Sequence, residues 1–354
     1  MKSHPPTIIG TATAVPSYTK STEEILGYLE EFLKDQEERF RQKVMRIFKY
    51  AQVDRRYAIM SAEDVFRPMS FEEKNRKYVT AAKSLSEEVL RKALEDANTA
   101  PGELDYIITV SCTGFMIPSV DAYLINSLGL SPDIVRLPVT EMGCVGGVSG
   151  LIYAEQFLKA NPNKKAAVVA VEAPSATFQR RDFSMTNMVS AAIFGDGAAA
   201  VILSSHKEDS GPVIRGSAMY HFYNETEMMG FEVVDSGFQM VLDVEVPEKI
   251  AEEFEDIIHP FLQDNGLQIQ DIDHLIFHPG GKKIVRLVED LFSQWGNNIE
   301  HTKEVLRQYG NMSSATVLFV LHKFLQEERK PKEKGLMLSF GPGFTAQRIL
   351  LEWQ

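Results

Sequence analysis

The sequence lacks the features that define several large classes of protein. Its two cysteines, Cys112 and Cys144, are too few for a disulfide framework or a zinc site of their own. No apolar run approaches the roughly 18 residues that a membrane-spanning helix needs, and the start of the chain, Met1–Pro6, has no apolar signal core. Acidic residues outnumber basic ones by 49 to 37, and this net charge of −12 disfavours nonspecific binding to nucleic acid. We therefore expect a cytoplasmic protein with no membrane or nucleic-acid partner.

What the sequence does contain is an alternation of strand-like and helix-like segments over 354 residues, a length sufficient for two domains. Short apolar runs predict strands at Ile8–Val15, Tyr106–Ser111, Ile134–Val139, Lys165–Glu172, Ala198–Leu203, His274–Phe277, Gly335–Phe340 and Gln347–Trp353. Longer amphipathic stretches predict helices from Ser21 to Tyr50 and at Glu72–Ala97, Asp121–Leu128, Pro247–Leu262 and Ile284–Trp295. This alternation predicts an α/β fold with largely covered sheets.

A polar stretch, Ser204–Gly211, divides the chain into two parts of similar makeup, and we interpret it as a linker. The expected units are residues 1–205, which hold both cysteines, and residues 212–354. Because both parts alternate strands and helices, we expect an internal structural duplication, although no sequence repeat is readable.

Cys144 stands at a junction of strand, tight turn and helix. The strand candidate Ile134–Val139 ends just before it, and small residues then lead into an amphipathic run whose apolar face holds Leu151, Ile152, Ala154 and Phe157. A thiol at a helix N-terminus meets free backbone N–H groups and the positive end of the helix dipole, and both favour the thiolate. Cys144 is therefore a candidate nucleophile. The alternative is a buried, inert cysteine that packs like a small hydrophobic residue.

Two further polar residues, His278 and Asn311, also stand at strand ends or helix starts in glycine-rich surroundings. Active sites of α/β folds gather at such ends. The three side chains suit one chemistry, in which a thiolate carries an acyl group as a thioester while an imidazole and an amide N–H₂ donate to an oxyanion. The alternatives are that His278 caps the following helix and that Asn311 is only an N-cap.

Five motifs, in order along nearly the whole chain, resemble those of the type III polyketide synthases, the chalcone synthase superfamily. They are Gly143-Cys144, Phe194-Gly195-Asp196-Gly197-Ala198-Ala199, His278-Pro279-Gly280-Gly281, Gly310-Asn311-Met312-Ser313-Ser314 and Phe340-Gly341-Pro342-Gly343. The resemblance implies the thiolase fold, with two related halves in a five-layered αβαβα arrangement, and a homodimer. It also implies an acyltransferase that uses malonyl-CoA and an acyl-CoA starter, with no metal and no prosthetic group.

The resemblance also assigns roles to the candidate catalytic residues. Cys144 would take the starter acyl group from coenzyme A and hold the growing chain. His278 and Asn311 would stabilise the enolate formed when malonyl-CoA loses carbon dioxide, and His278 would keep Cys144 as a thiolate. The product would be of the resorcinol, phloroglucinol or pyrone type.

Residues that handle coenzyme A are implied in the same way. Lys43 and Arg46 match positions that bind its phosphates, and Lys49 stands beside Tyr50, which occupies the third basic position of the family. Lys282 follows the His-Pro-Gly-Gly motif, where plant enzymes have proline. The alternative for all four basic residues is an ordinary solvated surface.

Other matches concern the gate and the cavity. Phe194 matches the gating phenylalanine between the coenzyme A tunnel and the cavity. The alternative for Phe194 is an ordinary aromatic residue of the core. Met240 replaces the family's second gating phenylalanine. The cavity positions implied by the resemblance are Cys112, Ile117, Thr177, Ser313 and Gly341. Ile117 falls where the family passes a residue into the partner's cavity. The stretch Ser111–Ser119, which contains Cys112, resembles that of the bacterial enzymes that build tetrahydroxynaphthalene or phloroglucinol from malonyl-CoA alone. Plant enzymes carry threonine at the position of Cys112. Ser339 replaces the first glycine of the usual Gly-Phe-Gly-Pro-Gly.

Three alternative functions are weighed against this hypothesis. An initiating β-ketoacyl carrier-protein synthase shares the fold and the Cys–His–Asn set, but the motifs around Asn311 and Gly341 favour the polyketide synthase. A papain-like hydrolase has its cysteine near the mature N-terminus, whereas Cys144 lies in mid-chain after a buried strand. A non-catalytic acyl-binding scaffold would not need the intact triad.

Overall fold

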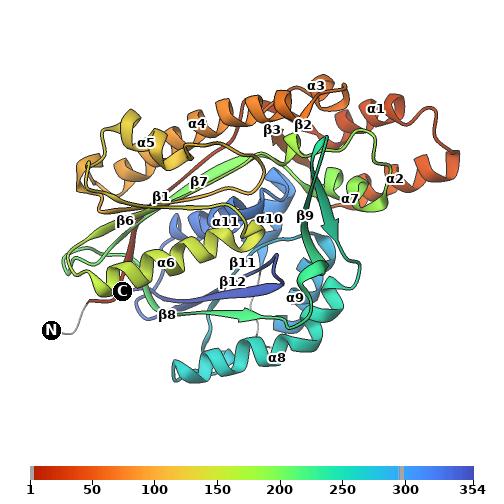
Figure 1. Ribbon diagram of the computed structural model, residues 1–354. Coiled ribbons are helices and arrows are strands. Elements are labelled where there is room, and N and C mark those ends of the chain that lie inside the picture. Colours follow the sequence, from red (N-terminus) through yellow and green to blue (C-terminus); the bar gives the residue numbers. More distant parts are fainter. Residues whose placement is uncertain (1–3, 294, 296–298) are drawn as a thin grey trace.

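The computed structural model describes residues 4–293, 295 and 299–354 (Figure 1). The helices are α1 Thr22–Phe32, α2 Glu38–Tyr50, α3 Ala62–Phe66, α4 Phe71–Asp96, α5 Val120–Leu128, α6 Gly146–Ala160, α7 Met185–Ile193, α8 Val246–Asp264, α9 Lys282–Ser293, α10 Glu300–Tyr309 and α11 Thr316–Leu325. The strands are β1 Thr7–Ala14, β2 Tyr18–Ser21, β3 Arg55–Ala58, β4 Tyr106–Val110, β5 Val135–Val139, β6 Lys165–Glu172, β7 Gly197–Ser204, β8 Val213–His221, β9 Met229–Val234, β10 Gly237–Leu242, β11 His274–Phe277, β12 Lys334–Gly341 and β13 Thr345–Glu352. In this described part of the chain, no helix is long and apolar enough to cross a membrane.

Nine strands form one mixed sheet in the order β11-β12-β13-β8-β1-β7-β6-β4-β5. The sheet is joined in the middle by a single residue pair between β1 and β8, Thr7 with Val213. On either side of that joint the pattern repeats. Strands β4 and β6 are parallel and β6, β7 and β1 are antiparallel, while β11 and β12 are parallel and β12, β13 and β8 are antiparallel. The two strand sets therefore share one topology, with β5 added at the edge of the first.

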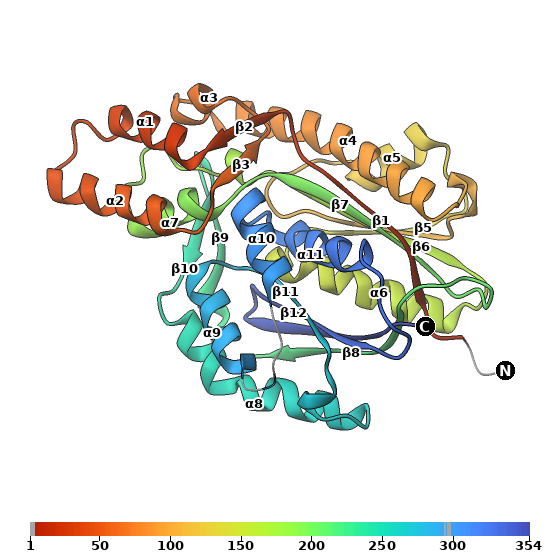
Figure 2. The ribbon, with the colours of Figure 1, turned by 180° about the vertical axis from the view of Figure 1, so that it is seen from behind.

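Helices lie above, between and below the two strand sets (Figures 1 and 2). Helices α4 and α5 cover the outer face of the first set, and α8 and α9 cover the outer face of the second. Helices α6 and α11 lie between the two sets, where residues such as Leu151 and Val317 are fully buried. Because apolar side chains are covered on both faces of each set, the strands tolerate their continuous apolar sequences.

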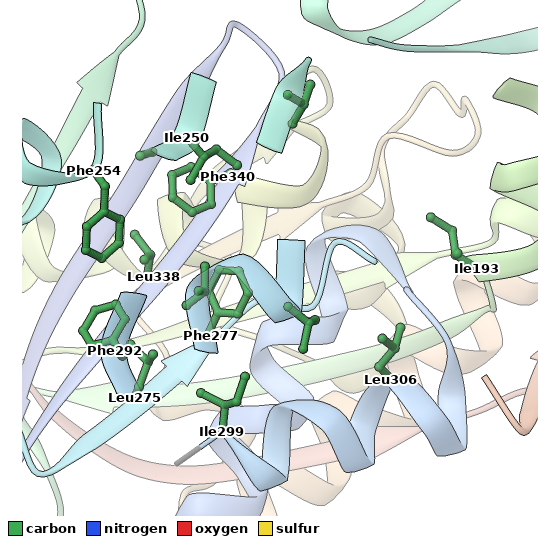
Figure 3. Packing of buried hydrophobic residues seen from close by; sticks show 14 of the residues in the cluster. Ile193, Ile250, Phe254, Leu275, Phe277, Phe292, Ile299, Leu306, Leu338 and Phe340 are labelled. Carbon is green, nitrogen blue, oxygen red and sulfur yellow. The ribbon is translucent and has the colours of Figure 1, made fainter. Parts of the chain in front are cut away.

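The outer face of the second strand set carries an aromatic core, which Figure 3 shows from close by. Phe254 of α8 and Phe292 of α9 meet edge to face, with ring centroids 5.3 Å apart. Phe277 of β11 and Phe340 of β12 lie on neighbouring strands, with centroids 6.2 Å apart. Both strands run from this core toward His278 and Pro342, so the packing fixes the ends that carry functional residues.

The predicted strands and most helices are confirmed to within a few residues, but the single helical stretch from Ser21 to Tyr50 is wrong. Helix α1 begins as expected, because the Ser21 hydroxyl accepts from Glu24 N and the Glu24 carboxylate accepts from Ser21 N. It ends at Phe32, and α2 begins at Glu38. Leu29 and Val44 join one buried cluster, because α1 and α2 fold back on each other, which one continuous helix could not do.

Several elements were not predicted. Helix α10, strand β8 and the pairs β2–β3 and β9–β10 have mixed sequences, and most of their residues are partly exposed, so they lack a clear apolar period. Helix α9 begins at Lys282 rather than Ile284 and ends at Ser293. Trp295 follows it in a turn, and residue 294 of the predicted helix lies outside the described residues.

Candidate active site

Cys144 lies in a 3₁₀ turn, Gly143–Val145, that leads directly into helix α6. Gly143 takes a φ of +52°, and a Cβ built there would stand 2.6 Å from Pro342 Cδ. Only glycine fits this left-handed, crowded position. The turn presents Cys144 Sγ to Ser313, with Sγ 3.7 Å from the hydroxyl oxygen. The predicted junction of strand, turn and helix is therefore confirmed.

His278 follows the end of β11 and is 2% exposed. Among the described residues, neither ring nitrogen has a hydrogen-bond partner, so both are free for a ligand. Burial lowers the pKa of His278 to about 3 and raises the pKa of Cys144 to about 11. Burial thus disfavours both the imidazolium of His278 and the thiolate of Cys144 when either is alone. Transfer of a proton from the thiol to the imidazole would create these two opposite charges together, and they would stabilise each other. The Ser313 hydroxyl and Asn311 lower the pKa of Cys144 and oppose the effect of burial.

Asn311 has its side-chain amide held in one orientation. Its oxygen accepts hydrogen bonds from Ser313 N at 2.8 Å and from the Thr316 hydroxyl at 3.2 Å. Its nitrogen is thereby turned toward the His278 loop, where it donates to Gly280 O at 3.3 Å. The oxygen thus accepts from the first residue of the 3₁₀ turn Ser313–Ala315, while the N–H₂ group lies on the side of the His278 loop. The N-cap of that turn is Met312, so the alternative that Asn311 is only an N-cap is wrong.

The structure brings Cys144, His278 and Asn311 together in the wall of one cavity of about 70 Å³. The predicted residues Cys112, Phe194, Met240 and Ser313 line the same cavity. Its remaining wall is mostly apolar and comprises Thr113, Gly143, Ile193, Met229, Gly230, Phe231, Leu242, Gly280, Ile284, Phe340 and Pro342. A thiol, an imidazole and an amide therefore share a small, mostly apolar space, and in such a setting fixed donors act most strongly on a developing charge.

A second cavity, of about 340 Å³, shares Phe194 and Met240 with the first. These two residues were predicted as gate positions, and they lie where the two cavities adjoin. The predicted residue Thr177 lines this second cavity and not the first. Its wall is largely apolar and includes Ile25, Phe48, Met60, Val65, Phe66 and Phe178. None of the predicted coenzyme A residues lines it.

The second cysteine belongs to a buried polar cluster around Glu172. Cys112 Sγ lies 3.4 Å from the Ser313 hydroxyl and 3.7 Å from Glu172 Oε2. Glu172 also accepts from Thr113 Oγ1 at 2.7 Å and from Ser314 Oγ at 2.5 Å. Burial raises the pKa of Glu172, and burial together with the Glu172 carboxylate raises the pKa of Cys112 well above its usual range. Ser313 therefore stands between the two thiols.

Two predicted cavity residues lie elsewhere. Ile117 is 81% exposed on the surface and lines neither cavity of this chain. Gly341 packs behind the nucleophile, where an added Cβ would meet Val145 N at 2.9 Å, so its smallness serves close packing of β12 against the Cys144 turn. Ser339, which stands where the family usually has glycine, donates from its hydroxyl to Cys144 O at 3.0 Å. This serine therefore contacts the turn that carries Cys144.

The predicted coenzyme A residues gather where α2 ends and α9 begins. Lys43, Arg46 and Lys49 are exposed on α2, and within the described residues none of them is in an ion pair with an acidic group. Lys282, the first residue of α9, lies with Nζ 5.7 Å from the ring centre of Tyr50. Since Lys282 is only four positions after His278, this basic surface is close in the chain to the His278 loop.

Sequence reasoning missed Glu172 and the hairpin residues Met229, Phe231 and Leu242. The sequence did contain a signal for Glu172, because this carboxylate stands at the end of the buried strand Lys165–Glu172. A buried charge needs hydrogen-bond partners, so a polar cluster around it could have been expected. No comparable signal marked the hairpin residues, because only the pairing of β9 with β10 turns them toward Cys144.

Both parts of the chain match models of one protein family. Residues 2–207 match the family model of chalcone and stilbene synthases, N-terminal domain, and residues 216–353 match that of the C-terminal domain. A 1,3,6,8-tetrahydroxynaphthalene synthase of Streptomyces peucetius is 34% identical over 313 residues, covering 87% of this chain and 83% of the relative. An alpha-pyrone synthesis polyketide synthase-like protein of Mycobacterium tuberculosis is 30% identical over 370 aligned positions, covering 98% and 92%.

A solved structure of a bacterial type III polyketide synthase also matches this chain over nearly its whole length. The tetrahydroxynaphthalene synthase of Streptomyces coelicolor, described as a bacterial type III polyketide synthase, superimposes with a TM-score of 0.92 at 29% identity, covering 98% of this chain and 99% of that one. These matches do not favour the carrier-protein synthase alternative. The chain belongs to the chalcone and stilbene synthase family and is a bacterial type III polyketide synthase, an acyltransferase.

Proposed function

We propose that the protein condenses malonyl-CoA units onto an acyl group held as a thioester on Cys144 and then releases a cyclised product. The observation that carries this proposal is the shared cavity, in which Cys144, His278 and the N–H₂ group of Asn311 line one small apolar space. No metal or prosthetic group is needed for the reaction, because the leaving carbon dioxide and the thioester supply the driving force.

The first step loads the starter. The Cys144 thiol gives its proton to the unprotonated nitrogen of His278, and the thiolate attacks the carbonyl carbon of the acyl-CoA thioester. The coenzyme A thiol then leaves with the proton from the imidazolium, which restores neutral His278. Since burial holds the pKa of His278 at about 3, its neutral form is available to take the proton at pH 7.

The second step extends the chain. Malonyl-CoA loses carbon dioxide, and the negative charge moves to its thioester oxygen as an enolate. The Asn311 N–H₂ group and the N–H of neutral His278 donate hydrogen bonds to that oxygen. The enolate carbon then attacks the thioester on Cys144, a carbon–carbon bond forms, and Cys144 leaves as the thiolate. The lengthened chain returns from coenzyme A to Cys144 for the next round.

The basic surface at α2 and α9 would hold coenzyme A. Lys43, Arg46, Lys49 and Lys282 present four cations on a protein of net charge −12, where phosphate groups would otherwise be repelled. The pantetheine arm would then pass Phe194 and Met240 toward Cys144.

The second cavity favours a starter with an apolar chain. An apolar wall stabilises an aliphatic or aromatic tail, and the shared residues Phe194 and Met240 place that wall next to the cavity of Cys144. Methionine at position 240 is flexible and leaves more room than the phenylalanine of the family. A malonyl-primed reaction is the second candidate, because Cys112 lies within reach of Ser313 beside the nucleophile.

The repeated strand order supports the thiolase fold with two related halves, residues 1–205 and 212–354. A homodimer is proposed from the exposed apolar side chains of Ile117 and Phe115, which are 81% and 52% exposed, and from the open edge of β5. A second copy would cover these groups and place the partner's loop beside this cavity.

The test is product analysis by mass spectrometry with malonyl-CoA, alone and with a panel of acyl-CoA starters, together with intact-protein mass spectrometry. We expect polyketide products and an acyl adduct on the wild type. In Cys144→Ala the acyl adduct should be absent, and formation of polyketide products should fall at least about a thousandfold. In the control Cys112→Ser the adduct should be retained. Products from malonyl-CoA alone would favour the malonyl-primed candidate. A wild type inert with every acyl-CoA would refute the proposal.

A further inference from the structure

The hairpin of β9 and β10 forms a wall of the catalytic cavity but stands outside the main sheet. Its strands pair only with each other, with Met240 opposite Phe231. It contributes Met229, Phe231, Met240 and Leu242 to the cavity that contains Cys144. Because no ladder of backbone hydrogen bonds ties it to the nine-stranded sheet, other contacts must set its distance from the nucleophile.

Lys74 of α4 makes one such contact. Its side chain is buried, with the residue 7% exposed, and Nζ donates to Phe178 O at 2.7 Å and to Ser236 O at 3.3 Å. Ser236 lies in the turn between β9 and β10, and Phe178 lines the second cavity. A buried ammonium that meets carbonyl groups in place of a carboxylate costs stability. An apolar side chain of the same length would avoid that cost, so the role of Lys74 is to fix a geometry.

Gln179 makes a second contact between the same segments. It is 4% exposed, and its Nε2 donates to Phe238 O of β10 at 2.8 Å and to Thr177 O at 3.0 Å. Phe71, one turn before Lys74 on α4, meets Phe238 edge to face at 5.5 Å. Lys74 and Gln179 thus join the loop of Thr177 and Phe178 to the hairpin from two sides. We call these two residues the hairpin clamp.

We propose that the hairpin clamp, Lys74 with Gln179, fixes the width of the passage between the two cavities and so determines how many extensions the chain undergoes. The inference rests on the proposed function. Neither residue touches the reacting atoms in this account, so both are positioning residues. They act through the hairpin that carries Met240 and the loop that carries Thr177, both of which line the second cavity.

The physical consequence concerns the intermediate. A growing polyketide stays extendable only while its linear form fits the space available, and a loosened wall lets it fold back and leave early as a short pyrone. Loss of the buried hydrogen bonds of the Lys74 ammonium or of the neutral Gln179 amide shifts the population of the held hairpin by about tenfold. The product ratio should move by a similar factor.

The experiment compares Lys74→Met and Gln179→Met with the wild type, using malonyl-CoA and the best starter, at equal conversion. Methionine has the length of glutamine and is one atom shorter than lysine, and in both variants it removes the donor. Lys92→Met is the matched control, because Lys92 is exposed on the same helix and pairs only with Glu88 in the described residues. We expect the ratio of the longest product to early-released pyrone to fall about tenfold in both variants, to be unchanged in Lys92→Met, and to recover in Lys74→Arg, whose fork can reach both carbonyls.

Unchanged product ratios in both clamp variants would overturn the inference, and so would a Lys74→Arg enzyme that behaves like Lys74→Met. If Lys74→Met does not fold, Gln179→Met decides, because it retains the ammonium contacts. The activity of the wild type distinguishes failure of the proposed function from failure of the clamp. A wild type that makes no polyketide refutes the proposed function, whereas a productive wild type with insensitive clamp variants refutes only the clamp.

Discussion

Phe194 and Asn311 pair through their backbones as an isolated parallel bridge. Asn311 N donates to Ile193 O at 2.7 Å, and Gly195 N donates to Asn311 O at 3.0 Å. Gly310, with φ +74°, allows the approach, since an added Cβ would stand 2.7 Å from Ile193 O. The residue at the boundary of the two cavities and the amide of the candidate triad therefore keep a fixed distance, and a change at one should be felt at the other.

The pH dependence of Cys144 alkylation should reveal how far His278 lowers its pKa. Burial, opposed in part by hydrogen bonds from Ser313 and Asn311, raises the pKa of the Cys144 thiol to about 11. In His278→Ala, alkylation by iodoacetamide should therefore rise about tenfold per pH unit from pH 7 to pH 10, because only the thiolate reacts. In the wild type the imidazolium stabilises the thiolate, so the rate should reach its plateau at a lower pH. Identical profiles in the two proteins would contradict the proposed proton transfer. Cys112→Ser provides the background in which Cys144 is the only thiol.

Replacement of Met240 by phenylalanine should narrow the passage between the cavities. Met240 lines both of them, and a rigid ring there would exclude a long chain. We expect kcat/KM for long acyl-CoA starters to fall roughly tenfold more than for short ones. Val233→Phe is the control, because Val233 is on the same hairpin but 72% exposed. A uniform loss for all starters would instead indicate damage to the catalytic cavity.

The basic surface at α2 and α9 should contribute to binding through phosphate groups. Lys43→Gln, Arg46→Gln and Lys282→Gln should each raise KM for malonyl-CoA roughly fivefold at low salt with little change in kcat, and the effect should fade as salt screens the charges. A short pantetheine analogue of malonyl-CoA that lacks the nucleotide phosphates serves as the control substrate. If the variants affect that analogue equally, these three cations do not bind phosphate.

Gly143 should tolerate no side chain. Gly143→Ala combines a positive φ with a clash against Pro342, so we expect a loss of about 1–3 kcal/mol in the free energy of unfolding and slower acylation of Cys144. Gly27→Ala is the opposite case, because Gly27 lies inside α1 with open space around it. It should stabilise the protein by up to about 1 kcal/mol. Denaturant titration measures both, and equal stability of the two variants would contradict the geometry at the Cys144 turn.

The parts of the fold that sequence could predict are those whose signal is local. Lys165–Glu172 and His274–Phe277 were predicted to the residue, because a run buried on both faces is apolar throughout. The break between α1 and α2 could not be read, because the apolar spacing continues across it and only packing against a common core decides. The β9–β10 hairpin was missed for a related reason, since most residues of both strands are only partly buried and the sequence shows no clear alternation.

The candidate site divides in the same way. Cys144, His278 and Asn311 could be named because each sits at a glycine-rich end of an element, and the family motifs supplied the grouping. Their presence in one cavity depends on strands far apart in sequence, which no local pattern contains. Ile117 and Gly341 show that a match of sequence position does not place a residue in the cavity. Ile117 is on the surface of this chain, and Gly341 packs behind the Cys144 turn.

The short joint at Thr7 and Val213 has a consequence for the life of the protein in the cell. One strand set leads to Cys144 and the other to His278, while the amide of Asn311 stands at the start of the helix that precedes β12. A chain that has folded only its first part would therefore hold Cys144 without His278 and Asn311. The candidate site is complete only when the second strand set is in place.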